Sequence, residues 1–465
     1  MKRFWLVLLA LGMLFAFSSS VFAADVKFTG SYYAAGMYQN KGTLMKDGGL
    51  YAGTAASNFR DDNSTAFYYQ RLRVGMYFVV TPALSLVTRF DVMERVWGAP
   101  RSAASAGGML SLVPDTGSAG TVAENENIAF DWAYIQYVSP IGMFQVGYQQ
   151  DGAWGTVFGD NSVPLAKIQY VIRTGPITGI AYAGKIMELN RTAKYAGMNA
   201  TDVDLDKYML GVVYQVNKDI QTGLLFVHLR NATNKAAYWA PVHPLIGANT
   251  YFQIASTLQP YFKAKVGPVA LEGEFQYLWG EAERTNGTSK VKIENYALYL
   301  NALADLGMFY AGGTFAWFSG DKPGTNNKVE GGVLTGGIDW NPCLILWNYD
   351  KRYWAGALPG YNSTNATALM ANVWFGQLKA GVRPIPALDI MASVSYAQAD
   401  KKPLNFVKKD YGWELDVTAT YAITNNLSYM LGVGYLWTGD YYQGTSSANK
   451  LNDDYLVVNK LTLTF

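Results

Sequence analysis

The fold of this chain is decided by residues 68–92, which read YYQRLRVGMYFVVTPALSLVTRFDV. Apolar residues occupy every second position from Leu72 to Val80, and the positions between them are mostly polar or small. The alternation resumes at Leu84, after a break at Thr81-Pro82-Ala83. A period of two residues is typical of a β-strand with one apolar face, and proline favours the turn between two strands. The stretch therefore predicts an antiparallel hairpin.

The hairpin pattern recurs along the chain, and its connections alternate between short and long. Short turns rich in Gly, Pro and Asn occur at Thr81-Pro82, Ser139-Pro140-Ile141-Gly142, Gly175-Pro176, Asn217-Lys218-Asp219, Gly267-Pro268, Leu306-Gly307, Pro384-Ile385-Pro386 and Asn425-Asn426. Long polar stretches separate them, at residues 39–63, 98–127, 189–202, 231–248, 281–290, 320–328 and 438–453. This asymmetry is the topology of an outer-membrane β-barrel with short periplasmic turns and long extracellular loops. Eight hairpins and one strand at each end predict an all-β, antiparallel, up-and-down barrel of about 18 strands, within a range of 16 to 20.

One segment leaves the strand count open. Residues 329–340 and 343–349 could form a ninth hairpin that turns at Asn341-Pro342, which would give 20 strands. The run Leu344-Ile345-Leu346-Trp347 does not alternate, and this favours a segment packed inside protein. We therefore prefer 18 strands and expect residues 320–365 to be a long extracellular insertion, folded over or into the lumen as a possible constriction.

Composition is consistent with such a barrel. Charged residues make up 15% of the chain, against roughly 25% in a soluble protein. Aromatic residues also make up 15%, and the chain contains 33 Tyr and 47 Gly. Beyond the N-terminus no stretch approaches 18 consecutive apolar residues, so no helical membrane span is predicted. The single Cys343 excludes an intramolecular disulfide framework.

The N-terminus has the features of a secretory signal peptide. Lys2 and Arg3 precede an uncharged apolar stretch at residues 4–17, and Val21-Phe22-Ala23 offers a cleavage site. A transmembrane anchor is the alternative, but this stretch is too short to cross roughly 30 Å of hydrocarbon. We expect residues 1–23 to direct export through the Sec pathway and residues 24–465 to form a single barrel. Without Lys2 and Arg3 the chain has 35 basic and 35 acidic residues, which argues against a nucleic-acid partner.

The C-terminus carries a second local signal. The chain ends at Phe465, and an alternating apolar face precedes it with Asn459 as its one polar member. That face consists of Tyr455, Val457, Leu461, Leu463 and Phe465. It resembles the terminal signal that outer-membrane proteins present to the barrel-assembly machinery.

The polar face of the strands would line the pore. Its predicted members are Arg71, Arg73, Arg89, Asp91, Arg95, Asp131, Lys167, Gln169, Arg173, Lys185, Glu272, Glu274, Glu414 and Asp416. If the two residue numbers of each cross-strand pair in the first hairpin add up to about 162, Arg73 faces Arg89 and Arg71 faces Asp91. Directly opposed like charges are unfavourable, so this register predicts either a neighbouring acid such as Asp131 or an anion site. Early strands supply mostly basic residues and later ones mostly acidic residues, which could set a field across the lumen. The alternative is that these charges pair locally and hydrate a wide lumen.

Aromatic residues near the predicted strand ends or on the apolar face are expected to form interfacial girdles. They are Trp97, Trp132, Tyr134, Tyr148, Tyr277, Trp279, Trp413, Tyr435 and Trp437. A sugar-stacking surface in the lumen is the alternative and needs aromatics on the polar face. Its candidates are Tyr77 and Tyr137, with Trp347, Tyr349, Tyr353 and Trp354 in the insertion.

Catalytic function is not predicted. The chain has two histidines, His228 and His243, and neither has a Ser or Asp partner at a catalytic spacing. We find no metal-ligand cluster and no phosphate-binding glycine loop in the sequence pattern. We therefore expect a protein that is not an enzyme and uses no cofactor or metal.

Two short motifs and the closing strand carry a family resemblance. The motifs are Phe318-Ser319-Gly320-Asp321 and Asp339-Trp340-Asn341-Pro342, with Asn348 following, and the closing strand ends at Phe465. With these, the chain resembles the large outer-membrane porins and is most similar to 18-stranded alginate-export-like channels and related porins of sulfate- or metal-reducing bacteria. The resemblance implies a pore, diffusion without a cofactor and selectivity set by lumen charge. Alginate exporters further imply a strongly basic lumen, which the balance of 35 basic and 35 acidic residues does not share.

Together these patterns predict an outer-membrane channel for passive diffusion of ions and small hydrophilic solutes, with weak selectivity. A barrel of 16 to 18 strands is too wide for its side chains to fill, so water enters. Its surroundings would be lipid and lipopolysaccharide, and its state a monomer or a homotrimer. Two alternatives stay open. One is a channel specific for an oligosaccharide or polymer, and the other is a barrel that displays loops for adhesion or sheathes an electron-conduit complex.

Overall fold

The computed structural model describes residues 25–44, 46, 64–98, 128–189, 203–235, 251–284, 290–325, 327–356, 358 and 369–465. The expected signal peptide, residues 1–23, lies outside the described residues, as do parts of the expected long loops. In the described part of the chain, no helix is long and apolar enough to cross a membrane.

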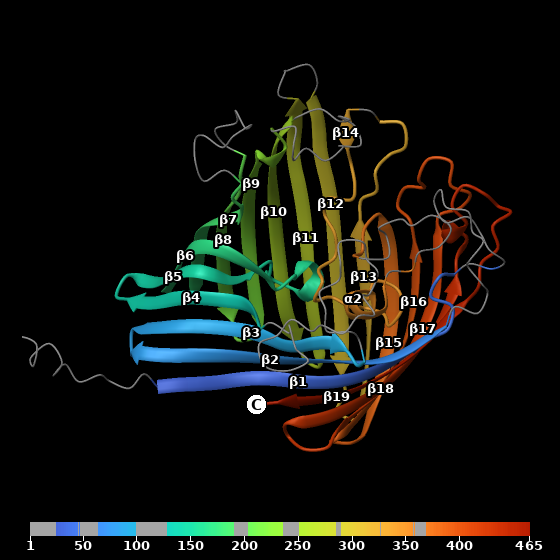
Figure 1. The fold of residues 1–465 in the computed structure, drawn as a ribbon, viewed down its shortest axis with the longest axis horizontal. Coiled ribbons are helices and arrows are strands. Elements are labelled where there is room, and N and C mark those ends of the chain that lie inside the picture. The colour runs from blue at the N-terminus through green and yellow to red at the C-terminus, as the bar shows by residue number, and fades with distance from the viewer. Residues whose placement is uncertain are drawn as a thin grey trace, which may run out of the picture.

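The described strands form one closed antiparallel barrel of 18 strands, as the hairpin count predicts (Figure 1). The barrel strands are β1 (Asp25–Gln39), β2 (Thr65–Thr81), β3 (Leu84–Val96), β4 (Ala129–Ser139), β5 (Gly142–Asp151), β6 (Val163–Thr174), β7 (Ile177–Met187), β8 (Leu205–Asn217), β9 (Ile220–Asn231), β10 (Tyr251–Val266), β11 (Val269–Arg284), β12 (Lys290–Asp305), β13 (Phe309–Phe318), β15 (Val373–Ile385), β16 (Leu388–Gln398), β17 (Asp410–Ala422), β18 (Leu427–Thr438) and β19 (Asp454–Thr464). The remaining described elements are the two-residue strand β14 (Lys328–Val329), the helix α2 (Tyr349–Ala355) and the 3-10 turns η1 (Val157–Gly159), η2 (Thr233–Lys235) and η4 (Asp440–Gln443).

Each strand pairs with its neighbours in sequence, and β1 pairs with both β2 and β19 to close the ring. The seam runs from Ser31 opposite Thr464 to Gln39 opposite Leu456. All eight predicted short turns connect consecutive strands, so they lie together at one end of the barrel. The longer connections lie at the other end, because consecutive strands are antiparallel.

Side chains alternate between the two faces of the wall, as the period of two predicts. Outward-facing apolar residues are exposed, for example Leu378 at 74% and Ile168 at 63%. Inward-facing neighbours on the same strands are covered, for example Gln377 at 7% and Lys167 at 7%. An apolar outer surface suits hydrocarbon, because apolar area removed from water is stabilising there.

An aromatic belt runs over the outer face of β11 to β15. Tyr277 stacks on Trp279 and Tyr296 at ring-centroid distances of 5.1 and 5.0 Å, and Trp317 stacks on Trp374 at 5.4 Å. The expected girdle members Tyr148, Trp279, Trp413, Tyr435 and Trp437 share this outward orientation.

Three aromatics lie on the face opposite to the one expected. A bulge at Asp131 in the β3–β4 pair puts Trp132 opposite the inward-facing Arg89, so Trp132 and Tyr134 point into the barrel. Tyr137 is paired with Leu84 on the outer face and is 47% exposed. Of the two wall candidates for a sugar-stacking surface, only Tyr77 therefore faces inward.

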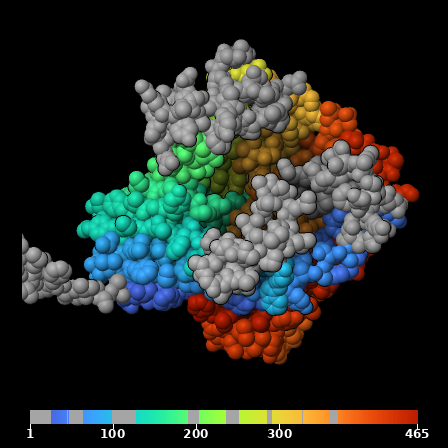
Figure 2. All heavy atoms as spheres, in the orientation of Figure 1, coloured from blue at the N-terminus to red at the C-terminus, as the bar shows by residue number. Residues whose placement is uncertain are grey.

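Two segments fold inward from the long-loop end and occupy part of the lumen. We call residues 319–372, between β13 and β15, the long insertion, and residues 152–162, between β5 and β6, the short insertion. Figure 1 shows α2 of the long insertion within the ring of strands. The space-filling view is hollowed between the β3–β8 side and the β16–β19 side, and atoms coloured as residues near 300 lie deep in the hollow (Figure 2). No ninth hairpin forms, because residues 343–347 are buried as an irregular segment.

The seam yields a first prediction. The backbones of Gly30 and Phe465 exchange two hydrogen bonds, of 2.8 and 3.0 Å, and the Phe465 ring covers Gly30. A Cβ atom at Gly30 would lie 2.5 Å from the Arg73 backbone oxygen and 2.6 Å from the Phe465 ring. We expect Gly30→Ala to destabilise the closed barrel by about 1–3 kcal/mol, because the neighbouring strand must shift.

Refolding into detergent micelles and comparing the migration of unheated samples on gels measures the closed fraction. Gly376→Ala is the matched control, because a Cβ there meets nothing within 4 Å. A Gly30→Ala barrel that closes as fully as the control would contradict the importance of this contact.

Candidate functional site

The long insertion is held to the inner wall by polar side chains of several strands. Glu414 on β17 accepts the backbone N–H groups of Ile345 and Leu346, at 2.6 and 2.8 Å. Gln377 on β15 donates to the Pro342 carbonyl at 2.7 Å. One buried side chain thus pairs two backbone N–H groups that would otherwise be unsatisfied inside the barrel, so Glu414 is a principal anchor.

The far end of the long insertion reaches the opposite side of the seam. Trp354 of α2 stacks on Tyr69 of β2 at 4.6 Å, and Asp350 lies 3.8 Å from the Lys460 ammonium on β19. Asn295 on β12 accepts the Val333 N–H at 2.9 Å. The insertion therefore contacts the inner wall from β12 round to β2.

The short insertion uses the same kind of anchor. Glu274 on β11 accepts both the backbone N–H and the hydroxyl of Thr156, at 3.0 and 2.8 Å. Phe158 is fully buried and stacks on Phe318 at 4.7 Å. The Trp154 indole donates to the Gln259 carbonyl at 3.0 Å, so the segment is fixed against β10 as well.

The two insertions join each other inside the barrel. The Gly337 N–H donates to the Phe158 carbonyl at 2.9 Å, and the Asp339 N–H donates to the Asp160 carbonyl at 3.0 Å. Gly337 leaves no room for a side chain, because a Cβ atom would lie 2.0 Å from the Asp160 carbonyl oxygen. The insertions thus form one continuous internal structure that narrows the lumen.

Charged residues on β2 to β4 form a network on the part of the wall that faces this structure. Arg73 makes two hydrogen bonds of 2.7 Å to Asp91, and Arg89 lies 3.0 Å from Asp131. Arg73 also lies 3.7 Å from Asp131. The Arg73 side chain is 29% exposed and that of Asp131 22%, so water reaches the network.

The register of this hairpin differs from the expected one. The turn residues are Pro82-Ala83, and Val79 pairs with Ser85. The two residue numbers of each pair therefore add up to 164 along most of the hairpin. The shift of two residues keeps every side chain on its face but brings Arg73 opposite Asp91 instead of Arg89. The expected Arg–Arg pair is therefore wrong, whereas Asp131 stands beside Arg89 in the way the first alternative required.

A bulge near the end of β3 changes two further positions. Met93 has a φ of 54°, and the pairing jumps from Val92 opposite Leu72 to Arg95 opposite Gln70. As a result Arg95 points outward, like Gln70. Regular alternation from Arg89 and Asp91 would place it in the lumen. Glu94 points inward instead and binds Arg71 at 3.3 Å. The sequence pattern missed Glu94 because a bulge has no fixed signature in residue types.

Lys167 faces inward and lies 3.4 Å from the Asp151 carboxylate. The same carboxylate lies 2.5 Å from the Lys207 ammonium and accepts a hydrogen bond from the Tyr182 hydroxyl at 2.7 Å. Lys185 is opposite Ala166 and therefore lies on the outer side, in ion pairs with Asp204 and Asp206 near the loop end. The expected lumen position of Lys185 is wrong, because Tyr182 and Gly184 occupy the inward positions of β7.

Arg173 has inward alternation but is exposed at the short-turn end. Glu272 faces inward and accepts hydrogen bonds from Tyr299 and Asn301, at 3.0 and 3.1 Å. Asp416, the remaining expected residue, is buried on β17 beside Glu414. The later acids are therefore engaged with neighbouring side chains and the insertions, and they do not form a free acidic ladder.

A row of amides continues the inner wall beyond the arginines. Gln145 on β5 donates to Gln136 on β4 at 2.8 Å, and Gln169 on β6 donates to Gln145 at 2.7 Å. Each amide retains unused donor or acceptor capacity. The wall beside the insertions thus offers neutral hydrogen-bonding groups next to paired charges.

Two hollows mark the space left inside. One of about 200 Å³ is bordered by Ser31, Arg73, Tyr77, Arg89 and Trp132. Another of about 400 Å³ lies nearer the short-turn end and includes Lys263, Lys265, Glu272 and Gln221. Both combine polar and charged groups, which can bind or pass hydrated solutes but form no catalytic arrangement among the described residues.

Burial affects the ionisation of two residues of the insertions. Burial raises the pKa of the Asp160 carboxyl to about 6, although the Trp154 N–H donates to it at 2.7 Å. Burial also lowers the pKa of Lys351 in α2 to about 8, against the opposing effect of Asp454 and Glu414. The internal structure therefore has groups that titrate close to neutral pH.

A scan against protein-family models gives no match, and a search of curated proteins gives none. Among solved structures, OccK9 (OpdG) of Pseudomonas aeruginosa matches with a TM-score of 0.52 at 14% identity, over 95% of this chain and 99% of that one. OccK2 (OpdF) of the same organism, in complex with glucuronate, matches with a TM-score of 0.51 at 10% identity, over 96% and 99%. The outer membrane protein OpdK of P. aeruginosa has a TM-score of 0.49 at 12% identity, over 94% and 99%. The likeness shows a shared fold, that of outer-membrane β-barrels.

Asp160 yields a prediction on pH. Because its pKa is raised from 3.8 in the folded chain, its contribution to stability is full below about pH 3.8 and is lost as the pH rises through about 6. Asp160→Asn keeps an oxygen that can accept the Trp154 N–H but removes the buried charge. We expect it to stabilise the barrel at pH 7.5 by about 1 kcal/mol, a value reduced for partial solvent screening.

Guanidinium unfolding of both proteins between pH 4 and 7.5 measures the difference. Asp440→Asn, which removes an exposed carboxylate that is not among the groups acting on Asp160, is the control and should follow the wild-type profile. Equal stability of wild type and Asp160→Asn at every pH would contradict the burial of this charge.

Proposed function

We propose that the protein is a porin-type channel of the bacterial outer membrane through which ions and small hydrophilic solutes diffuse passively, with weak charge selectivity. The observation that carries the proposal is the water-accessible network of Arg71, Arg73, Asp91, Glu94 and Asp131 on the inner wall of a closed 18-strand barrel. An inner wall of ionised groups is stable only where water fills the lumen, because desolvating them would be costly.

Weak selectivity follows from how these charges are arranged. The ion pairs of the network cancel most of the field at a distance, so neither cations nor anions gain a large advantage. The 35 to 35 balance of basic and acidic residues after residue 23 supports the same inference. Strong polyanion transport, as in alginate export, would need arginines without acidic partners.

A channel specific for a hydroxylated solute is the second candidate. The hydrogen-bonded row of Gln136, Gln145 and Gln169 favours it, because amides can exchange hydrogen bonds with hydroxyl groups. The structurally similar OccK2 was solved with glucuronate, a small hydroxylated acid. The sheath of an electron-conduit complex is disfavoured, since the chain's own insertions occupy the lumen that a protein partner would need.

Charge removal tests the channel and its selectivity. Arg73→Gln and Arg89→Gln together leave Asp91 and Asp131 without their arginine partners, so the lumen becomes more negative. We expect the reversal potential in a salt gradient across a planar bilayer to shift toward cation preference.

Lys185→Gln is the matched control. It removes one positive charge from the outer side of the wall and should leave the reversal potential unchanged. Absence of conductance steps for the folded wild type would overturn the channel proposal. An unshifted potential in the double variant would overturn the assignment of these arginines to the permeation path.

Removal of the long insertion tests the constriction. A Cβ atom at Gly320 would lie 1.8 Å from the Asn372 side chain, so the two ends of the insertion are adjacent. A short Gly-Ser linker can therefore replace residues 321–371 without opening the wall. We expect the single-channel conductance to rise several-fold, because a wide barrel without internal segments is a water-filled pore.

Gel migration of the unheated deletion variant first checks that the barrel is closed. A closed deletion variant with wild-type conductance would show that the insertion does not limit permeation.

A further inference from the structure

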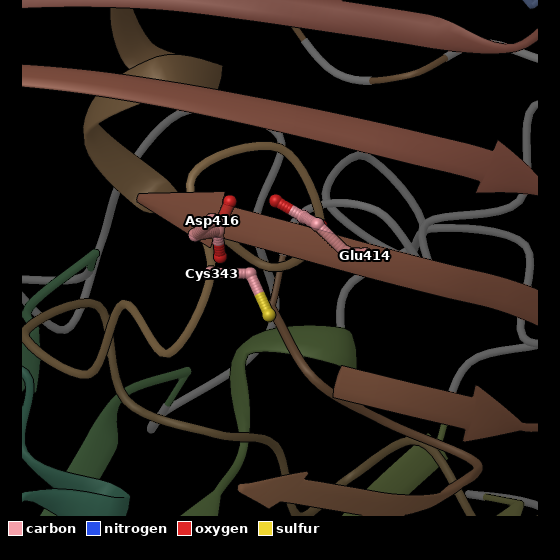
Figure 3. A group of neighbouring side chains, drawn as sticks. All are labelled: Cys343, Glu414 and Asp416. Atoms are coloured by element: carbon pink, nitrogen blue, oxygen red, sulfur yellow. The ribbon is translucent and has the colours of Figure 1, made fainter. Parts of the chain in front are cut away.

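We propose that Cys343, Glu414 and Asp416 form a binding site for a divalent cation of Zn²⁺ character, which fastens the long insertion to the barrel wall. The Cys343 thiol and one oxygen of each carboxyl group lie within 4.8 Å of one another. Cys343 comes from the insertion, whereas Glu414 and Asp416 project from neighbouring inward positions of β17 (Figure 3). A bound ion would thus join two parts of the chain that are about 70 residues apart in sequence.

The burial of the cluster creates the need for a cation. The exposed fractions are 3% for Cys343, 0% for Glu414 and 2% for Asp416. Two carboxylates so close together repel each other, and burial adds a desolvation cost for each. Among the described residues, no lysine or arginine forms an ion pair with either carboxylate. A divalent ion would neutralise both charges at once.

Unsatisfied polar atoms provide independent support. Ser393 on β16 is directly opposite Asp416 and is 3% exposed; its hydroxyl lies near the Asp416 carboxyl group but makes no hydrogen bond of standard geometry. The Oδ1 atom of Asp416 likewise has none. Buried polar atoms are nearly always paired in native proteins, so these two neighbouring atoms have hydrogen-bonding or ligating capacity that a shared cation would use.

The donor set identifies the class of ion. A thiolate with two carboxylate oxygens suits Zn²⁺, which takes sulfur at about 2.3 Å and oxygen at about 2.0–2.2 Å in tetrahedral sites. Ca²⁺ and Mg²⁺ prefer oxygen donors alone. The Ser395 hydroxyl, which accepts a hydrogen bond from the Cys343 thiol at 3.4 Å, could instead donate to the thiolate and support it as a ligand. Binding would release the thiol proton to solvent as the thiolate forms.

The site also differs from the other anchor of the lumen. Glu274 holds the short insertion by accepting two hydrogen bonds from Thr156, and it accepts a third from Gln276 on its own strand. Among the described residues it is not grouped with a thiol and a second acid as Glu414 is. Glu414 already accepts two N–H groups from the long insertion, so a metal would tighten an anchor that is in place. Since the cluster is buried, the ion would enter during folding of the barrel.

Zinc stoichiometry of the full-length barrel tests the proposal. The chain is folded into detergent with Zn²⁺ or with EDTA, desalted, and its metal measured by elemental analysis. We expect one Zn²⁺ per chain in the first sample and none in the second. Cys343→Ser and Glu414→Gln should weaken Zn²⁺ binding at least about 100-fold, because removal of supporting groups alone costs 10–100-fold.

Glu274→Gln is the matched control, because it removes a buried anchoring carboxylate elsewhere and should leave zinc binding unchanged. Wild-type barrels that retain no Zn²⁺, or Cys343→Ser barrels that retain as much as wild type, would overturn the site.

A spectroscopic measurement with Co²⁺ tests the site even if a carboxylate variant fails to fold. Co²⁺ in place of Zn²⁺ gives a thiolate-to-metal charge-transfer band when sulfur is a ligand. Cys343 is the single cysteine, so this band can arise from no other residue. We expect the band in wild type and its loss in Cys343→Ser. Bound Co²⁺ without the band would overturn the role of Cys343. Neither result depends on conductance, so the channel proposal stands or falls separately.

Discussion

The pairing of backbone N–H and C=O groups is the constraint on which the rest of this structure depends. In hydrocarbon no water is available to satisfy these groups, so a sheet that spans a membrane must leave no edge unpaired. Here the first and last strands meet along the seam from Ser31–Thr464 to Gln39–Leu456, and Phe465 continues the pairing to Gly30. Closure of 18 strands then fixes a wall that is too wide for its own side chains to fill.

The width of the wall explains why the interior is built from two inserted segments. A loop that enters the lumen brings backbone polar groups with it, and these need partners. Glu414 and Glu274 meet this need with carboxylate oxygens that accept N–H groups from the long and the short insertion. Each of these side chains pairs more than one donor of an insertion, so the insertions can be held without a large apolar contact to every strand. The β2–β6 side of the wall keeps a polar surface within the lumen beside the joined insertions.

The charges of that surface act mainly on one another. Arg73, Arg89, Asp91 and Asp131 form a continuous network, and Lys167 and Lys207 share Asp151 in the same way. Paired charges hydrate the wall without producing a strong field of one sign. This arrangement differs from a ladder of free arginines, and it is the structural basis of the weak charge selectivity that we propose.

The sequence by itself determined the barrel and its eight short turns, because alternation and turn residues are local properties. It favoured 18 strands but left 20 open, since residues 329–349 could have formed a further hairpin. It also indicated which residues carry the charges of the lumen, and that residues 344–347 do not form a regular strand. Only the tertiary structure decided which charges meet. A shift of two residues in one hairpin exchanged the partner of Arg73, and a bulge at Met93 moved Arg95 outward and Glu94 inward. The grouping of Cys343 with Glu414 and Asp416 likewise depends on where an irregular segment comes to rest against a distant strand. Register, bulges and the path of an insertion are set by contacts between residues far apart in sequence, so a local sequence pattern does not predict them.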